Sequence, residues 1–205
     1  ALLEGDVAAV GIIGMASRVE SVLARGQSNV KDIELAPGRW LRPSHRFITT
    51  GKLDEALVRQ TLEALREEGV QVVVASSAFG VDDQSAEELV MRVATELGLA
   101  VTGGHEITKL YGLTTRTRTA VINASILPKM IGTATMTEVA VREAGITAPL
   151  MIMRGDGGVM DVQEMRRRPV VTMLSGPAAS VAGALMYLRV SDGIYFEVGG
   201  TSTNI

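Results

Sequence analysis

Cysteine is absent from this chain of 205 residues, which excludes a disulfide framework and any metal site built on thiolates. Aromatic residues are scarce, with three Phe, three Tyr and one Trp, so the core must consist of aliphatic side chains and Met. The chain has no apolar run of the roughly 18 residues that span a bilayer, and it lacks the basic start of a secretory signal. Its net charge of −3 comes from interspersed acids and bases, which argues against nucleic acid as a partner. We therefore expect a cytoplasmic protein that binds neither membranes nor nucleic acids.

The middle of the chain alternates between helical and strand patterns. The spacing predicts an amphipathic helix over Leu53–Glu68 and then a strand over Val70–Ala75 that is buried on both faces. A second amphipathic helix, capped by Asp82 or Asp83, precedes a strand at Leu99–Thr102. This βαβ-type alternation favours an α/β fold with a sheet covered by helices.

The first part of the chain contains shorter signals. An apolar run at Val7–Ile13 predicts a strand, and Ser17–Arg25 predicts a helix whose apolar residues share one face. Short strands are expected at Ile33–Leu35 and Phe47–Thr49, with residues 37–45 between them as a loop. No internal repeat or long linker separates these elements from the rest, so we expect a single compact unit.

A longer helical pattern covers Ala120–Ala144. Pro128 lacks a backbone N–H and its ring clashes with the preceding turn of a helix, and several Thr lower the helix propensity further. We therefore expect this helix to be kinked or broken at Pro128 and Gly132.

Three apolar runs near the carboxyl end each stop in a turn of glycines and hydroxyl residues. The runs are Leu150–Met153, Val170–Leu174 and Ile194–Val198, and each is predicted to be a strand. Such strand ends point backbone N–H groups at sites where a phosphate or another anion binds, although a simple tight turn is the alternative for each. The second turn also begins a predicted helix, Ala178–Leu188, with Ser175 as its cap.

These turns carry a family resemblance. The segments MRGDGGVM, RRRPVVTMLSGPAASVAGA and FEVGGTSTN resemble the RSDGG, RPV-TLLSGPAAGV-GA and DMGGTSTD motifs of the hydantoinase A/5-oxoprolinase family, in the same order and spacing. The segment TTRTRTAVIN also resembles the family's ERTSTTVVNA. The family belongs to the actin-like ATPase superfamily, in which two ribonuclease-H-like domains, each a mixed sheet flanked by helices, close over a nucleotide. The resemblance implies that residues 1–205 lie in the amino-terminal lobe and that residues 194–205 begin the second lobe.

The resemblance also implies a chemistry. Family members bind ATP and Mg²⁺ and open a cyclic amide such as hydantoin or 5-oxoproline, through phosphorylation of the amide oxygen and attack by water. In this scheme SGPAAS resembles the first connecting motif and VGGTSTN the second phosphate loop. The implied nucleotide- and phosphate-binding residues are Ser175, Gly176, Gly199, Gly200, Thr201, Ser202 and Thr203.

Asp156 is the candidate catalytic residue. It follows a predicted strand in a loop where Gly157 and Gly158 leave room for a ligand, so its carboxylate can orient or deprotonate water or hold hydrated Mg²⁺. A turn aspartate is the alternative. The family has Asp at the positions of Glu197 and Asn204, and this departure puts metal binding at Glu197 in question.

Two further sets of polar residues lie nearer the middle of the chain. His105 and Glu106 follow a predicted strand and are either a metal or acid–base pair or two polar residues of a turn. Arg116 either holds a carboxylate or phosphate or is a solvated charge at a helix start.

The family's first phosphate loop is not in this sequence, and its adenosine motif would follow Ile205. We therefore expect a fragment of an ATP-dependent hydrolase that is inactive by itself and that acts, within the whole protein, on a small cyclic amide with a partner subunit or as a homo-oligomer. Two alternatives stay open: a carboxylase subunit of the same family, and a non-catalytic nucleotide-binding or regulatory protein with the same fold.

Overall fold

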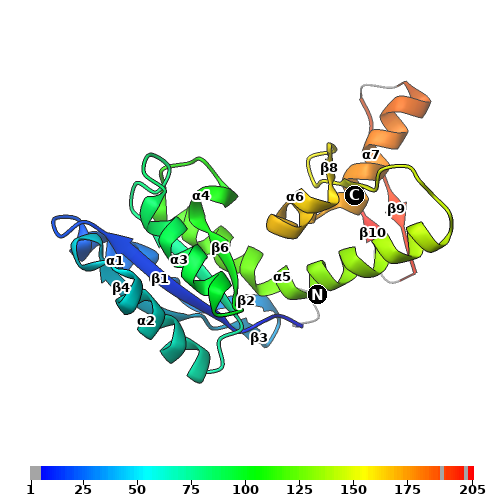
Figure 1. Ribbon diagram of the computed structural model, residues 1–205. Helices are drawn as coiled ribbons and strands as arrows, with labels where there is room; N and C mark the ends of the chain where they lie inside the picture. The colour runs from blue at the N-terminus through cyan, green and yellow to red at the C-terminus, as the bar shows by residue number, and fades with distance from the viewer. Residues whose placement is uncertain (1–5, 190–191, 201–202) are drawn as a thin grey trace. The chain divides into compact units, whose positions relative to one another are not determined.

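The chain forms two compact units in the computed structural model, which describes residues 6–189, 192–200 and 203–205. Unit 1 is Ala1–Gly132 and unit 2 is Thr133–Ile205, where the sequence predicts a single unit. The long helix α5, Leu113–Glu143, belongs to both, whereas no described strand of unit 2 joins the sheet of unit 1 (Figure 1). Each unit therefore has sheets of its own: β4-β1-β5-β6 and β2-β3 in unit 1, and β7-β8 and β9-β10 in unit 2.

Unit 1 is built on a four-stranded parallel sheet with the order β4-β1-β5-β6. The strands are β1 (Val10–Ala16), β4 (Ser44–Thr49), β5 (Val72–Ser77) and β6 (Ala100–Gly103). Every residue of β1 and β5 is buried, as expected for central strands covered on both faces. The predicted α/β fold with a sheet flanked by helices is confirmed.

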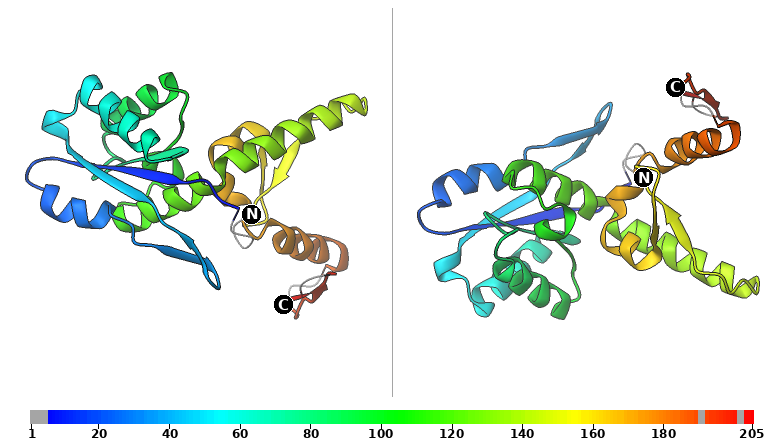
Figure 2. Two further views of the ribbon diagram at one scale, coloured as in Figure 1. Left: turned by 90° about the horizontal axis from the view of Figure 1, so that it is seen from below. Right: turned by 90° about the horizontal axis from the view of Figure 1, so that it is seen from above.

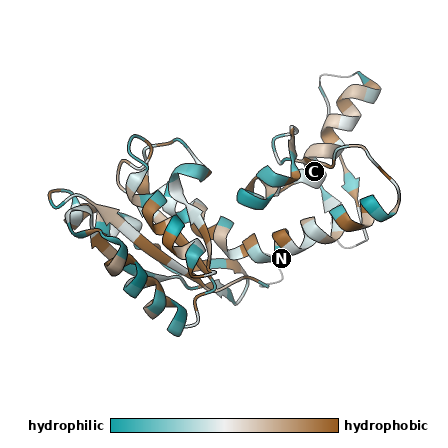
Figure 3. Cartoon of the chain, viewed as in Figure 1, coloured by the Kyte–Doolittle hydropathy of each residue, from teal (hydrophilic) through white to brown (hydrophobic). Residues whose placement is uncertain are grey.

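Helices cover both faces of this sheet (Figure 2). Helices α2 (Glu55–Glu67) and α3 (Ser85–Glu96) pack on the face that contains Ile13. Helix α5 packs on the opposite face with Ile12, because successive side chains of a strand point to opposite sides. The outward residues of α2 are hydrophilic (Figure 3), which confirms its predicted amphipathic pattern.

Helix α1 (Ser21–Ser28) lies on the α5 face of the sheet, against β1. Gly14 allows this approach, since a Cβ atom there would lie 2.2 Å from Ser28 Oγ. The predicted apolar stripe of this region does not face the core: Val19 and Leu23 are 93% and 68% exposed. Ala24 and Ser28 are the buried residues of α1 instead, because only small side chains fit at this distance from the sheet.

Two further predictions for unit 1 are wrong. Residues 37–45 are not a loop, because β2 (Ile33–Ala36) and β3 (Arg39–Leu41) form an antiparallel hairpin around Gly38, and His45 lies within β4. Helix α5 is also continuous through Pro128 and Gly132. Ala120, Val121, Ala124 and Leu127, which precede Pro128, are buried against the sheet, so tertiary packing overrides the weak helix propensity of this segment.

Unit 2 contains short elements. The strand expected at Leu150–Met153 is β7, but it forms a two-stranded antiparallel hairpin with β8 and does not join the sheet that contains β5. The strand expected at Val170–Leu174 is a 3₁₀ turn, η2, because Pro169 at its start fixes φ and has no N–H to donate. The elements of unit 2 after α5 are β7 (Met151–Met153), β8 (Val159–Asp161), α6 (Val162–Arg167), η2 (Pro169–Thr172), α7 (Ser175–Leu188), β9 (Glu197–Val198) and β10 (Thr203–Asn204). None of the helices in the described part of the chain combines the length and the apolar character needed to cross a bilayer.

Candidate functional site

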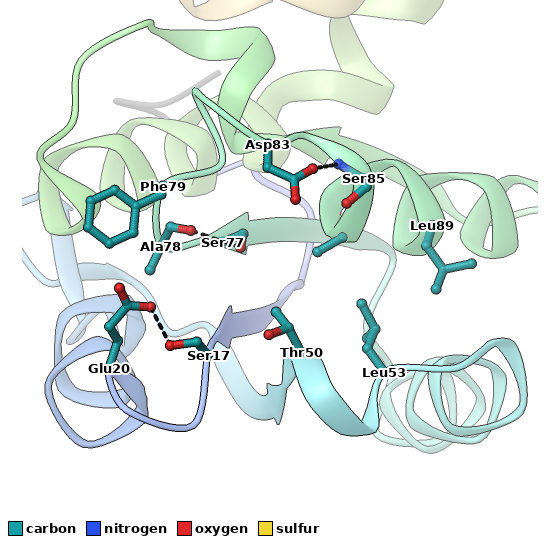
Figure 4. Close-up of a pocket in the computed structure, with 11 residues that line it drawn as sticks. Ser17, Glu20, Thr50, Leu53, Ser77, Ala78, Phe79, Asp83, Ser85 and Leu89 are labelled. Atoms are coloured by element: carbon teal, nitrogen blue, oxygen red, sulfur yellow. Dashed lines mark hydrogen bonds between the residues drawn. The ribbon is translucent and has the colours of Figure 1, made fainter.

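A cleft of about 440 Å³ lies at the carboxyl ends of β1, β4 and β5. Figure 4 shows Ser17, Glu20 and Thr50 on one side of the hollow and Asp83 and Ser85 on the other. Leu53, Ala86 and Leu89 form an apolar wall between α2 and α3. A second hollow shares Ser17 and Thr50 with the first and is also lined by Arg18, Thr49, Gly51 and Lys52. We call the two hollows together the switch-point cleft.

Topology places this cleft where ligands collect in open α/β sheets. The chain leaves β1 for α1 on one face of the sheet, but it leaves β4 and β5 for α2 and α3 on the opposite face. Because connections from neighbouring strands diverge, a crevice opens beside the end of β1 that no side chain of the sheet fills. Sequence reasoning located the strands but not this crevice, since strand order is not visible in the sequence.

The cleft is lined by hydroxyl groups and carboxylates. Ser17 Oγ donates to Glu20 Oε2 at 2.6 Å, and the Ser85 N–H donates to Asp83 Oδ1 at 3.0 Å. The Ser85 hydroxyl and this N–H hold the pKa of Asp83 below its ordinary value. Asp83 therefore stays ionised at neutral pH. It also satisfies an N–H of the first turn of α3, in partial agreement with the predicted cap.

A buried carboxylate joins the two loops that follow β5 and β6. Glu87 on α3 is fully buried, and its Oε1 accepts the Ser77 N–H at 2.7 Å. Its Oε2 accepts the His105 N–H at 2.8 Å and lies 2.6 Å from His105 Nδ1. The hydrogen bond to Glu87 raises the pKa of His105. Glu87 was missed in the sequence, although a Glu three residues before Val90 on a buried stripe is an available signal.

His105 and Glu106 lie in a short helix, α4 (Gly104–Ile107), and do not act as a pair. His105 is directed to Glu87, whereas Glu106 Oε2 accepts the Gly103 N–H at 3.4 Å. The turn expected at this position is therefore a helical turn, and the two neighbouring side chains diverge as the sequence predicts.

Arg116 is fully buried, so its interpretation as a solvated charge is wrong. Its Nη2 donates to the carbonyl oxygen of Ser77 at 2.6 Å, and its Nη1 donates to the carbonyl oxygen of Leu110 at 2.8 Å. Burial lowers the pKa of Arg116, and the nearby Glu87 opposes this effect. Arg116 and Glu87 together hold the loop after β5, which forms part of the switch-point cleft.

Asp156 lies in the hairpin turn between β7 and β8. Its Oδ1 accepts the Gly158 N–H at 3.0 Å and its Oδ2 accepts from Arg154 Nη2 at 2.5 Å. The hydrogen bond from the Gly158 N–H contributes most to lowering the pKa of the Asp156 carboxyl, and the bond from Arg154 adds to this effect. The side chain is 58% exposed, so an ionised carboxylate faces solvent. This arrangement suits contact with a cation or with water better than proton abstraction near neutral pH.

The loop of Asp156 borders a hollow of about 450 Å³ in unit 2. Asp156 and Gly157 line it together with Leu174, which precedes α7, and with Pro177 and other apolar residues of α7. Helix α7 begins at Ser175, three residues before the predicted start at Ala178, and Leu174 rather than Ser175 holds the N-cap position. The structure thus brings two groups of predicted site residues, the Asp156 loop and the start of α7, to one place.

The predicted phosphate loop is only partly described. Gly199 and Gly200 are exposed after β9, and Thr203 pairs with Val198 in a short hairpin. Thr201 and Ser202 lie outside the described residues. The Asn204 side-chain amide donates to Glu197 Oε2 at 3.4 Å, so the two residues that depart from the family motif contact each other.

Among residues 6–189, 192–200 and 203–205, no group of three or more His, Asp and Glu side chains could hold a metal ion. Mg²⁺ does not require such a group, since it commonly binds through one or two carboxylates, water and the phosphates of its nucleotide. The exposed carboxylate of Asp156 fits this mode of contact.

Residues 116–205 match the family model described as Hydantoinase/oxoprolinase. The chain is 30% identical over 190 residues to the caprolactamase subunit alpha of Pseudomonas jessenii, an alignment that covers 85% of this chain and 27% of that protein. It is 23% identical over 157 residues to an uncharacterized protein of Methanocaldococcus jannaschii, with 73% of this chain and 23% of that protein covered. The chain therefore spans about a quarter of the length of these relatives.

Solved structures agree with the sequence relatives. The crystal structure of the ATP-dependent caprolactamase from Pseudomonas jessenii matches 99% of this chain and 32% of its own chain, with a TM-score of 0.69 and 28% identity. A nucleotide-free structure of acetone carboxylase matches 98% of this chain and 32% of its own, with a TM-score of 0.68. At 18% identity, the second likeness shows a shared fold only.

Proposed function

We propose that this chain, whose residues 116–205 match the hydantoinase/oxoprolinase family model, is part of an ATP-dependent enzyme that opens a cyclic amide. The similarity to an ATP-dependent caprolactamase supports both the use of ATP and an amide ring as the substrate. That relative is the alpha subunit of its enzyme, which supports a partner subunit for the whole protein. We also propose a cytoplasmic location, where ATP is available.

The observation that carries the proposal is the placement of Asp156 beside the start of α7. An amide is a poor electrophile, and ATP supplies the phosphoryl group that makes its carbon open to attack by water. Asp156 is held ionised by Gly158 and Arg154 in a loop of small residues. We assign Asp156 the task of orienting water or contacting hydrated Mg²⁺.

The exposed glycines Gly199 and Gly200, with Thr201, Ser202 and Thr203, are proposed to contact phosphate as the family resemblance implies. Glu197 has a carboxylate at the position where the family motif has Asp. A role of Glu197 with metal is the weaker part of the proposal, because its carboxylate is engaged by Asn204.

The Asp156→Asn variant tests the assignment in the whole protein. Asn keeps the size and can still accept from Gly158, but it removes the charge. If Asp156 acts on water or Mg²⁺, kcat should fall on the order of a hundredfold or more, with little change in ATP affinity. Asp32→Asn, at an exposed aspartate of unit 1, is the control and should retain kcat. Turnover of Asp156→Asn within a few-fold of wild type, at an unchanged melting temperature, would remove Asp156 from the mechanism.

A second candidate function is nucleotide binding without turnover. The substitutions at Glu197 and Asn204 favour it, because Asn carries no charge and the two side chains bond to each other. Measuring ATP binding and ATP-dependent ring opening on the same preparation separates the two functions. Binding without any ring opening across lactams, hydantoin and 5-oxoproline would select the second.

A further inference from the structure

The switch-point cleft has charges of opposite sign in its two hollows. Glu20 and Asp83 line the hollow between β1 and β5, and both are carboxylates. Arg18 and Lys52 line the hollow beside β1 and β4. Ser17 and Thr50 border both hollows, so the acidic and basic ends are contiguous.

The acidic hollow also has an apolar wall. Leu53, Ala86 and Leu89 line it, and Figure 4 shows Leu53 and Leu89 at the end of the hollow away from Glu20. A ligand that fits this lining carries a cationic group, an apolar or hydroxyl-bearing middle and an anionic group. A polyphosphate does not fit the acidic hollow, because its charges would meet two carboxylates.

The walls of the cleft are held in place from behind. The loop after β5 is fixed by the Glu87 bond to the Ser77 N–H and by the Arg116 bond to the Ser77 carbonyl oxygen. Gly80 packs against Glu87 so closely that a Cβ atom would lie 2.5 Å from Oε1. A cleft whose walls are ordered before binding loses less entropy when a ligand enters.

We propose that the switch-point cleft binds a small zwitterion of the amino-acid type. Its ammonium group lies between Glu20 and Asp83, its carboxylate lies at Arg18 and Lys52, and its carbon chain runs past Ser17 and Thr50. The charges, the apolar wall and the topology carry this assignment, independently of Asp156. Only the choice of probe rests on the proposed function, because hydrolysis of a lactam gives a molecule with one amine and one carboxylate, which is a zwitterion of this type.

Isothermal titration of the full chain with 6-aminohexanoate and with glutamate tests the proposal. Hexanoate and hexylamine each lack one charge and should bind at least about tenfold more weakly, which corresponds to about 1.4 kcal/mol. Neutral variants then locate the site. Glu20→Gln with Asp83→Asn should weaken 6-aminohexanoate and hexylamine but spare hexanoate.

Arg18→Gln with Lys52→Gln should show the converse pattern, weakening 6-aminohexanoate and hexanoate but sparing hexylamine. Matched controls are Glu88→Gln, on the exposed side of α3, and Lys109→Gln, which should bind like wild type. Gln and Asn still accept hydrogen bonds from Ser17 and Ser85, so the cleft walls are retained, and circular dichroism checks folding.

Absence of binding by both amino acids would overturn the proposal, as would equal affinity in wild type and all cleft variants. Failure of the proposed function gives a different result. In that case the amino acids still bind with the expected dependence on the four charges, while no ATP-dependent ring opening is found.

Discussion

Replacing Glu87 by Gln should destabilise unit 1 much more than any surface substitution of the same kind. The carboxylate is completely buried and accepts three hydrogen bonds, one on Oε1 from Ser77 and two on Oε2 from His105. Gln has one accepting oxygen and one donating NH₂ group. Whichever way the amide is turned, at least one buried N–H of the loops faces another donor.

The magnitude follows from these contacts. One buried N–H without an acceptor costs about 1–3 kcal/mol, and the loss of charge from the remaining bonds costs about 1 kcal/mol more. We therefore expect the free energy of unfolding to fall by about 2–4 kcal/mol, a large part of the roughly 5–15 kcal/mol of a typical domain. Glu88→Gln, one residue along α3 and exposed, should change it by no more than about 0.5 kcal/mol.

Urea unfolding followed by Trp fluorescence measures this effect in unit 1. The chain has one Trp, Trp40 in β3, so the signal comes from unit 1 alone. If Glu87→Gln unfolds within about 0.5 kcal/mol of Glu88→Gln, the buried carboxylate does not hold the two loops and this reasoning is wrong.

Three further predictions concern other contacts. The pKa of His105 is raised in the folded state, so its bond to the buried Glu87 carboxylate stabilises the folded state in full at pH values below the unfolded His pKa of about 6.5. This contribution is lost as the pH rises through the higher pKa of the folded state. Urea titrations should show that decline in wild type and not in His105→Gln; a rise across this window would contradict it. Gly155→Ala places Cβ 2.0 Å from the Met173 carbonyl oxygen and should destabilise unit 2 by about 1–3 kcal/mol. In the control variant Gly176→Ala the new Cβ meets no atom within 4 Å, so the substitution should be tolerated. Hydrogen exchange of the backbone amides of unit 2 measures the difference between the two variants. Asp54→Ala removes the side-chain cap of α2 and should lower the free energy of unfolding by about 1 kcal/mol, with an unchanged urea midpoint as the refuting result.

Local patterns predicted the central elements of unit 1 well. The apolar run of β5 and the regular spacing of α2 leave little choice of structure, because a strand buried on both faces and an amphipathic helix have distinct periods. The Asp156 loop and the start of α7 were also located from their glycines and small residues, although the strand expected before α7 is a 3₁₀ turn.

Other features depend on contacts distant in sequence. Pro128 lies in a continuous helix because its neighbours are buried on the sheet, and Arg116 is buried because carbonyl oxygens of separate loops accept its hydrogen bonds. The spacing of Glu87 from Val90 indicates a buried position, but the partners of its carboxylate, Ser77 of β5 and His105 after β6, lie too far away in the sequence to be predicted from it.

The sequence by itself determined which segments form the strands and helices of the sheet and which glycine-rich turns resemble a nucleotide-dependent family, since both depend on residues close together in the chain. Only the tertiary structure decided the strand order β4-β1-β5-β6, and with it the cleft that joins Glu20, Asp83, Arg18 and Lys52. Strand order is the result of long-range pairing, so no local pattern records which loops meet at the end of β1.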